Sequence, residues 1–96
     1  MKSPRELNFR LYVAGNSPNS ALAKANLAQL CREHLADRHH VEVIDVLSEP
    51  ERALKDKVLL TPTLLKLEPR PVRTIIGNLS DTTVVLQALG LDPAKV

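Results

Sequence analysis

The sequence predicts a single α/β domain, in which a mixed sheet carries helices on its faces. Three observations predict this class: an alternating strand pattern near the N-terminus, helix-type spacing after it, and an apolar run in mid-chain. The 96 residues are enough for one domain, expected to span 1–96. With one Tyr, one Phe and no Trp, the core must be aliphatic.

The first half predicts a strand, a helix and a second strand. Apolar and polar residues alternate from Leu7 to Ala14, and Gly15-Asn16-Ser17-Pro18 ends this strand. Ser17 is placed to cap the next helix, whose first position suits Pro18. That helix is expected to run to about Ala36, because apolar residues recur along one face by steps of three and four. These residues are Ala23, Leu27, Leu30, Cys31 and Leu35.

Residues 37–40 are predicted as a polar connection, and Val41 to Leu47 as the second strand. This strand is almost continuously apolar, which indicates a strand covered on both faces. A strand, a crossover helix and a second strand form a parallel, right-handed unit.

The second half predicts a helix, a hairpin and a final element. Ser48 and Glu51 have capping-box spacing for a short helix that reaches about Lys57. Thr63–Glu68 and Val72–Ile76 are predicted strands, joined by the turn Pro69-Arg70-Pro71.

The final element is ambiguous. Ser80 or Asp81 can cap a helix that Gly90 stops. The β-branched run Thr82–Leu86 suits a strand equally well. Read as a helix, it completes the order βαβαββα, which is the thioredoxin-like order.

Composition restricts the function classes. The net charge of +2 is too small to indicate a nucleic-acid partner. A single cysteine, Cys31, excludes an intrachain disulfide and fits a reducing compartment. No apolar run is long enough for a signal peptide or a membrane span, so a cytoplasmic location is expected.

A thiol redox site is not predicted. The turn after the first strand, where a thioredoxin-like enzyme needs its cysteine pair, is Gly15-Asn16-Ser17-Pro18-Asn19-Ser20 and contains no sulfur. Cys31 falls on the apolar helix face and is interpreted as a buried, inert thiol. Thr61-Pro62, before a predicted strand, is typical of the cis-proline corner of such folds, and we expect a cis bond there.

No metal site or catalytic group is predicted, and no cofactor is expected. His34, His39 and His40 lie close in sequence, but no carboxylate or thiol at ligand spacing supports them. Asp45, within an apolar strand, is interpreted as a buried, hydrogen-bonded structural residue. The basic residues of the second half form either a solvated face or a docking surface for an acidic partner.

Four segments together resemble the KaiB family of bacterial clock proteins. The four segments occur in the same order as in the family and extend over most of the chain, and only their combination is specific to it. They are 11–20 (LYVAGNSPNS), 43–47 (VIDVL), 56–64 (DKVLLTPTL) and 71–80 (PVRTIIGNLS).

The resemblance implies a non-enzymatic regulator that docks on a KaiC-like ATPase ring. It also implies a second fold, βαββααβ, in an oligomeric resting form, a dimer or tetramer, while the thioredoxin-like monomer binds the ATPase. KaiA, or a KaiC-linked histidine kinase pathway, is a further implied partner. The contact residues it suggests are Asn19, His40, Glu42 and Lys57, with Lys66 and Arg73 on the same face or in the resting oligomer.

Pro62, Pro69 and Pro71 lie in the segment that changes fold. Ala88 and Gly90 depart from the cyanobacterial pattern, and both favour the thioredoxin-like form, because Ala stabilises a helix and Gly suits a helix stop. The departures put KaiA binding and a circadian role in doubt. The alternative functions are a sensor-type thioredoxin-like module of a signalling or stress pathway, and a thiol redox enzyme, against which the missing cysteine pair argues.

Overall fold

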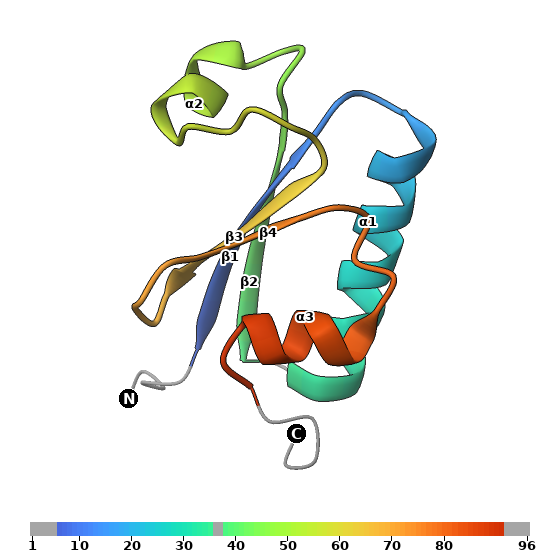
Figure 1. Cartoon of the computed structure of the whole chain (residues 1–96), viewed down its shortest axis with the longest axis vertical. Coiled ribbons are helices and arrows are strands. Elements are labelled where there is room, and N and C mark those ends of the chain that lie inside the picture. Colours follow the sequence, from blue (N-terminus) through green and yellow to red (C-terminus); the bar gives the residue numbers. More distant parts are fainter. Residues whose placement is uncertain (1–5, 36–37, 92–96) are drawn as a thin grey trace.

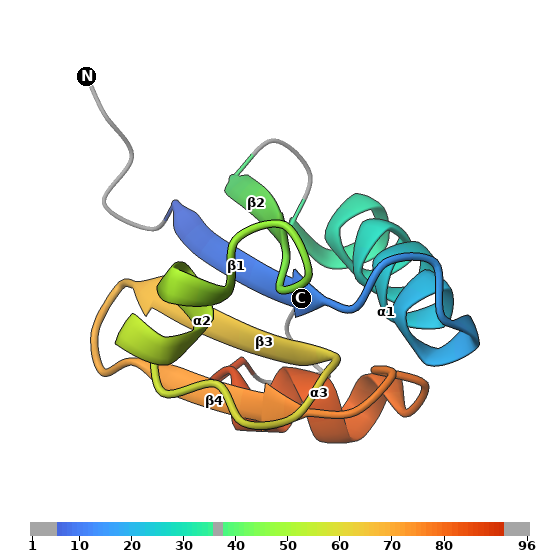
Figure 2. The same cartoon turned by 90° about the horizontal axis from the view of Figure 1, so that it is seen from above.

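The structure is a computed structural model that describes residues 6–35 and 38–91. A four-stranded sheet with the order β2-β1-β3-β4 runs through the molecule. Helices α1 and α3 cover one face of the sheet, and α2 covers the other (Figure 1 and Figure 2). The elements are β1 (Leu7–Val13), α1 (Pro18–Leu30), η1 (Cys31–Leu35), β2 (His39–Asp45), α2 (Pro50–Lys55), β3 (Thr63–Glu68), β4 (Arg73–Ile76) and α3 (Thr82–Ala88). The predicted class and element order are confirmed.

β1 is one of the two inner strands of the sheet. It pairs in parallel with β2 and antiparallel with β3, while β3 and β4 form the predicted hairpin. Because side chains alternate along a strand, β1 contributes to both faces. Phe9 and Leu11 join the core under α1 and α3, whereas Tyr12 joins a smaller cluster under α2.

The two faces have different cores. The α1/α3 side is aliphatic apart from Phe9 and Cys31, and it holds most of the buried residues. On the α2 side, four buried residues pack together, namely Tyr12, Ile44, Ala53 and Leu65. No helix within the described residues is long and apolar enough to cross a membrane.

The second strand differs from its prediction. β2 begins at His39, so the expected polar connection is wrong for His39 and His40. The strand is also not covered on both faces, because it lies at the edge of the sheet, where α1 shields only part of it. Ile44 is buried, but Val43 is 48% exposed.

The ends and caps of α1 and α2 also differ from their predictions. α1 gives way after Leu30 to the π-helical turn η1; Ala36, the predicted end, lies outside the described residues. The Ser17 side chain caps no backbone N–H and instead hydrogen-bonds the Ser20 hydroxyl at 2.9 Å. At α2 the N-cap is Glu49, so the predicted capping box is not formed, and the helix ends at Lys55.

Caps and burial make the last element a helix. Asp81 Oδ1 accepts a hydrogen bond from the Val84 N–H at 3.2 Å, which satisfies one of the free donors of the first turn. Gly90, just beyond the end of the helix, has a φ of +81°, which suits glycine. Val85 and Leu86 are buried in the α1/α3 core.

The proline-rich segments flank β3. The Thr61–Pro62 bond is cis, as expected, and Glu68–Pro69 and Arg70–Pro71 are cis as well. Pro62 is buried where the chain enters β3, while Pro69 and Pro71 are exposed in the β3–β4 turn.

Replacing Asp81 tests how far the cap stabilises α3. Asp81→Ala is expected to lower the free energy of unfolding by about 1 kcal/mol, because the Val84 N–H loses its acceptor. Asp81→Asn, whose side chain caps comparably, should stay close to wild type. Urea titrations followed by circular dichroism measure both variants, and equal stability of Asp81→Ala and wild type would contradict the capping role.

Candidate functional site

A network of charged groups joins β1, β2 and α2. Arg10 on β1 contacts Asp56 at 2.8 Å through Nη1 and Glu42 at 3.3 Å through Nε. Arg52 on α2 binds both oxygens of Glu42, at 2.7 and 3.0 Å. The bidentate contact fixes the orientation of both groups and connects the short helix to the sheet edge.

Tyr12 forms the buried end of this network. Its hydroxyl lies 2.5 Å from Asp56 Oδ2 and 3.0 Å from the Arg52 carbonyl oxygen. Burial, followed by the hydrogen bond to Asp56, raises the pKa of Tyr12 to about 12, so the phenol stays protonated and donates.

Two carboxylates of the network, Asp56 and Glu42, are held in the ionised form. Burial alone would raise the pKa of Asp56, but hydrogen bonds from Tyr12 and Arg10 outweigh it and lower that pKa. The hydrogen bond from Arg52 lowers the pKa of Glu42. The network therefore stays charged well below neutral pH.

Exposed apolar side chains lie next to this network. Leu59 is 88% exposed and Leu60 is 60% exposed. Both line a pocket of about 390 Å³ together with Asp56 and Lys57. Exposed leucines in a contiguous patch are typical of protein interaction sites. We call His40, Glu42, Lys57, Leu59 and Leu60 the α2 surface.

Three of the six predicted contact residues lie on the α2 side of the sheet. His40 and Glu42 lie on the α2 face of β2, at one edge of the sheet, whereas Lys57 lines a pocket with Thr74 and Ile76 of β4, at the other edge. Asn19 lies elsewhere, at the start of α1, where Asn78 Nδ2 donates to it at 3.4 Å.

Lys66 and Arg73 lie on the other face of the sheet. They are cross-strand partners on β3 and β4, and Lys66 also pairs with Phe9, whose side chain belongs to the α1/α3 core. They therefore do not share a surface with His40 and Glu42.

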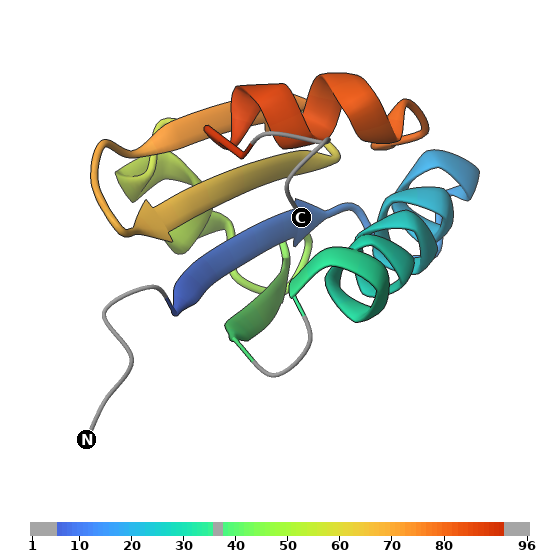
Figure 3. The ribbon, with the colours of Figure 1, turned by 90° about the horizontal axis from the view of Figure 1, so that it is seen from below.

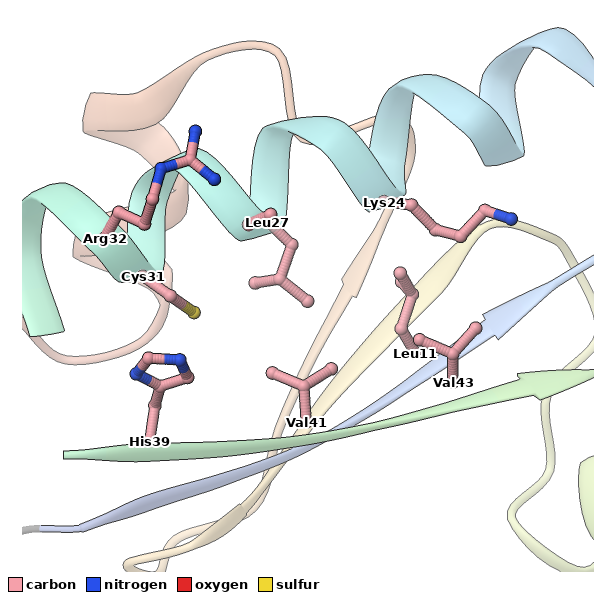
Figure 4. A pocket seen from close by; sticks show the side chains of 9 residues that line it. Leu11, Lys24, Leu27, Cys31, Arg32, His39, Val41 and Val43 are labelled. Atoms are coloured by element: carbon pink, nitrogen blue, oxygen red, sulfur yellow. The ribbon is translucent and has the colours of Figure 1, made fainter. Parts of the chain in front are cut away.

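A groove of about 360 Å³ opens between α1 and the exposed edge strand β2 (Figure 4). Leu27 and Val41 line it, and Cys31 points into it toward His39. Cys31 is buried, as predicted, and burial raises its pKa to about 11. A thiol with so high a pKa is a poor nucleophile at neutral pH.

The remaining polar candidates have structural surroundings. Asp45 is half-buried, and its Oδ1 accepts hydrogen bonds from the backbone N–H groups of Gly15 at 3.1 Å and Leu47 at 2.9 Å. The hydrogen-bonded role predicted for Asp45 is thus correct. Over residues 6–35 and 38–91, no group of three metal-ligating side chains is present.

Serines occupy the turn after β1 at the spacing of a cysteine pair. Ser20 is fully buried, and its Oγ accepts from the Ala14 N–H at 3.0 Å while lying 2.9 Å from Ser17 Oγ. The hydroxyls thus stabilise the turn without thiol chemistry.

Sequence reasoning missed Arg10, Arg52 and Asp56. Arg10 and Asp56 lie 46 positions apart, and only strand pairing and α2 docking bring them together. One signal was available: the alternation of β1 places Arg10 and Tyr12 on the same face. A polar pair on a central strand calls for polar partners on the helix that covers it.

Comparison with known sequences identifies one family. Residues 10–91 match the KaiB domain model. The chain is 51% identical over 84 residues to the circadian clock protein KaiB3 of Synechocystis, covering 88% of this chain and 80% of that protein. It is 46% identical over 92 residues to the circadian clock oscillator protein KaiB of Nostoc punctiforme, covering 96% of this chain and 86% of the relative.

Comparison with solved structures identifies the fold. The N-terminal domain of SasA from Synechococcus elongatus superposes with a TM-score of 0.75 at 21% identity, covering 97% of this chain and 91% of that domain. Mitochondrial thioredoxin 3 of Saccharomyces cerevisiae superposes with a TM-score of 0.71 at 17% identity, covering 91% of this chain and 80% of that protein. The thioredoxin-like fold predicted from the element order is confirmed.

Acid should weaken the charged network. Because the pKa of Asp56 is lowered on folding, its contribution is present above the ordinary aspartate pKa of about 4 and is lost as the pH falls below it. Asp56→Asn is expected to lower the free energy of unfolding at neutral pH by about 1–3 kcal/mol. Its stability should also fall less than that of wild type on acidification.

Urea titrations over a range of pH values measure both effects. Glu51→Gln is the matched control, because Glu51 is exposed on α2 and forms no ion pair within the described residues. A pH dependence identical in Asp56→Asn and wild type would contradict the assigned role.

A cysteine pair should be able to replace the two serines. In a Cys31→Ala background, Ser17→Cys with Ser20→Cys is expected to oxidise to a disulfide, because the two oxygens lie 2.9 Å apart at a helix start. Thiol titration after mild oxidation should show the loss of both thiols in the double variant and retention in each single variant. Two persistent thiols would show that the turn cannot hold the bond.

Proposed function

The chain belongs to the KaiB family of circadian clock proteins, and from this premise we propose that it is a non-enzymatic timing regulator that docks on a KaiC-like ATPase ring. The observation that carries the proposal is the KaiB match over residues 10–91. The buried, weakly acidic thiol of Cys31 and the serines at the cysteine-pair positions support a non-enzymatic role.

The α2 surface supports docking by its composition and its rigidity. Leu59 and Leu60 expose apolar area to water in this form, and burying that area against a partner is favourable. Glu42 is held by Arg10 and Arg52, so little side-chain entropy is lost there on binding. Lys57 adds a cation that can orient an acidic partner surface.

Asn19 provides a second, smaller contact region at the start of α1. It is exposed, and Leu22, one turn later, is 48% exposed. We assign Lys66 and Arg73 to neither region, because they lie on the α3 side of the sheet.

The thioredoxin-like form is proposed as the docking form. The resting form is proposed as a dimer or tetramer in which the second half adopts the order βαββααβ. The β-branched residues Thr82 to Val85, helical here, support this second state because they also suit a strand. Pro62, Pro69 and Pro71 lie in the segment that would rearrange.

Two residues favour the docking form. Ala88 is the last residue of α3, and Gly90 has the positive φ of a helix stop. We therefore propose a larger thioredoxin-like share than in cyanobacterial relatives. A KaiC-like ATPase without KaiA, or linked to a histidine kinase pathway, is the partner system that we propose.

Native mass spectrometry of the chain with the KaiC-like ATPase of its host and ATP tests the proposal. We expect a ring decorated with monomers of this chain. Leu59→Ser should weaken binding by at least about tenfold, because it removes the most exposed apolar side chain of the α2 surface. Lys57→Asn, which tolerates the φ of +59° at this position, should slow association.

Val84→Ser is the matched control, because Val84 is also apolar and exposed but lies on α3. Weakening by both serine variants alike would exclude the α2 surface as the contact. A free oligomer that persists across phosphorylation states and long incubation would contradict the docking role itself.

A further inference from the structure

Lys66 on β3 is the one charged residue that is buried within the described part of the chain, with 4% of its surface exposed. Its side chain lies on the α1/α3 side, in register with Phe9. Burying a cation is costly unless an anion or several hydrogen bonds compensate. The ammonium nitrogen of Lys66 is not among the fully buried, unpartnered polar atoms of the described residues, and Lys66 lines a pocket through which an anion can reach it.

The nearest strand neighbour of Lys66 increases this cost. Arg73 lies directly opposite on β4, and like charges in this position repel. Burial, followed by the charge of Arg73, lowers the pKa of Lys66. Among residues 6–35 and 38–91, no carboxylate lies within 4 Å of either cation. The described residues thus provide two converging cations and no counter-charge.

These cations line a pocket of about 350 Å³. It lies between the β3–β4 turn and the C-terminal end of α3, which lie on the same side of the molecule in Figure 3. Arg70, in the turn, adds a third cationic side chain to the lining, and Leu7 and Leu89 are among its apolar residues. The carbonyl end of α3 favours a nearby cation, by about 0.3–1 kcal/mol, which is too little to balance several.

We propose that this pocket is a binding site for a small, free anion that carries a phosphate group. A doubly charged, compact group matches the point charge of Lys66 and the forked guanidinium of Arg73. The apolar lining would exclude water and strengthen both contacts. The inference does not depend on the docking proposal, because the pocket and the α2 surface lie on opposite faces of the sheet.

Titration of the full chain with inorganic phosphate and pyrophosphate at low ionic strength tests the site. We expect saturable binding with one site per chain in calorimetry, with the largest amide NMR shifts at Lys66, Gly90 and Leu91. Lys66→Met and Arg73→Gln should each weaken binding by at least about tenfold. Lys55→Gln, which removes an exposed cation on α2, should stay within about twofold.

A stability measurement separates loss of the site from loss of the fold. Without phosphate, Lys66→Met should melt at the same temperature as wild type or higher, because a buried cation has been removed. Exposed Arg73 provides the independent test if Lys66→Met does not fold.

Three results would overturn the proposal. The first is the absence of saturable phosphate binding by wild type. The second is equal weakening by Lys66→Met and Lys55→Gln, which would indicate non-specific charge attraction. The third is phosphate binding that is seen only after Asp92→Asn, a change of the residue that follows Leu91 in the sequence, because the chain's own carboxylate would then be the anion.

Discussion

The position of β1 as an inner strand of the sheet is the constraint on which the other elements depend. Because β1 is hydrogen-bonded on both edges, its register positions β2 and β3 at the same time. Its alternating side chains then build two unlike cores. Phe9 and Leu11 require the aliphatic cover of α1 and α3, whereas Arg10 and Tyr12 require polar partners, which α2 and the residue after its end, Asp56, provide.

The polar face explains how a six-residue helix becomes a fixed part of the surface. A helix as short as α2 is not stable in isolation. The charges of Arg10, Glu42 and Arg52 and the hydrogen bond of Tyr12 attach it to the sheet. Single exposed ion pairs contribute little, but a network anchored on a buried tyrosine holds its members in one arrangement. Leu59 and Leu60, which follow the end of α2 after three intervening residues, are thereby presented at a defined place.

The opposite side of the sheet combines α3, a helix whose residues also suit a strand, with Lys66, a cation that has no counter-charge within the described residues. α3 contains residues that suit a strand, and it is helical because Asp81 caps it while Val85 and Leu86 are buried against the core. Local preference and tertiary packing therefore disagree in α3, and packing decides the outcome. Lys66 lies beneath the end of this helix, so an anion bound there would stabilise this form.

The sequence by itself determined the parallel first unit, the hairpin Thr63–Ile76 and the order of the elements as far as that hairpin, while it left the last element open between helix and strand. These depend on alternation, helical spacing and turn residues, which are properties of neighbouring positions. Only the tertiary structure decided that β2 lies at the sheet edge, that Arg10 meets Asp56, and that Lys66 is buried beside Arg73. Those outcomes depend on strand order and register, which arise from contacts between distant segments and leave no local pattern.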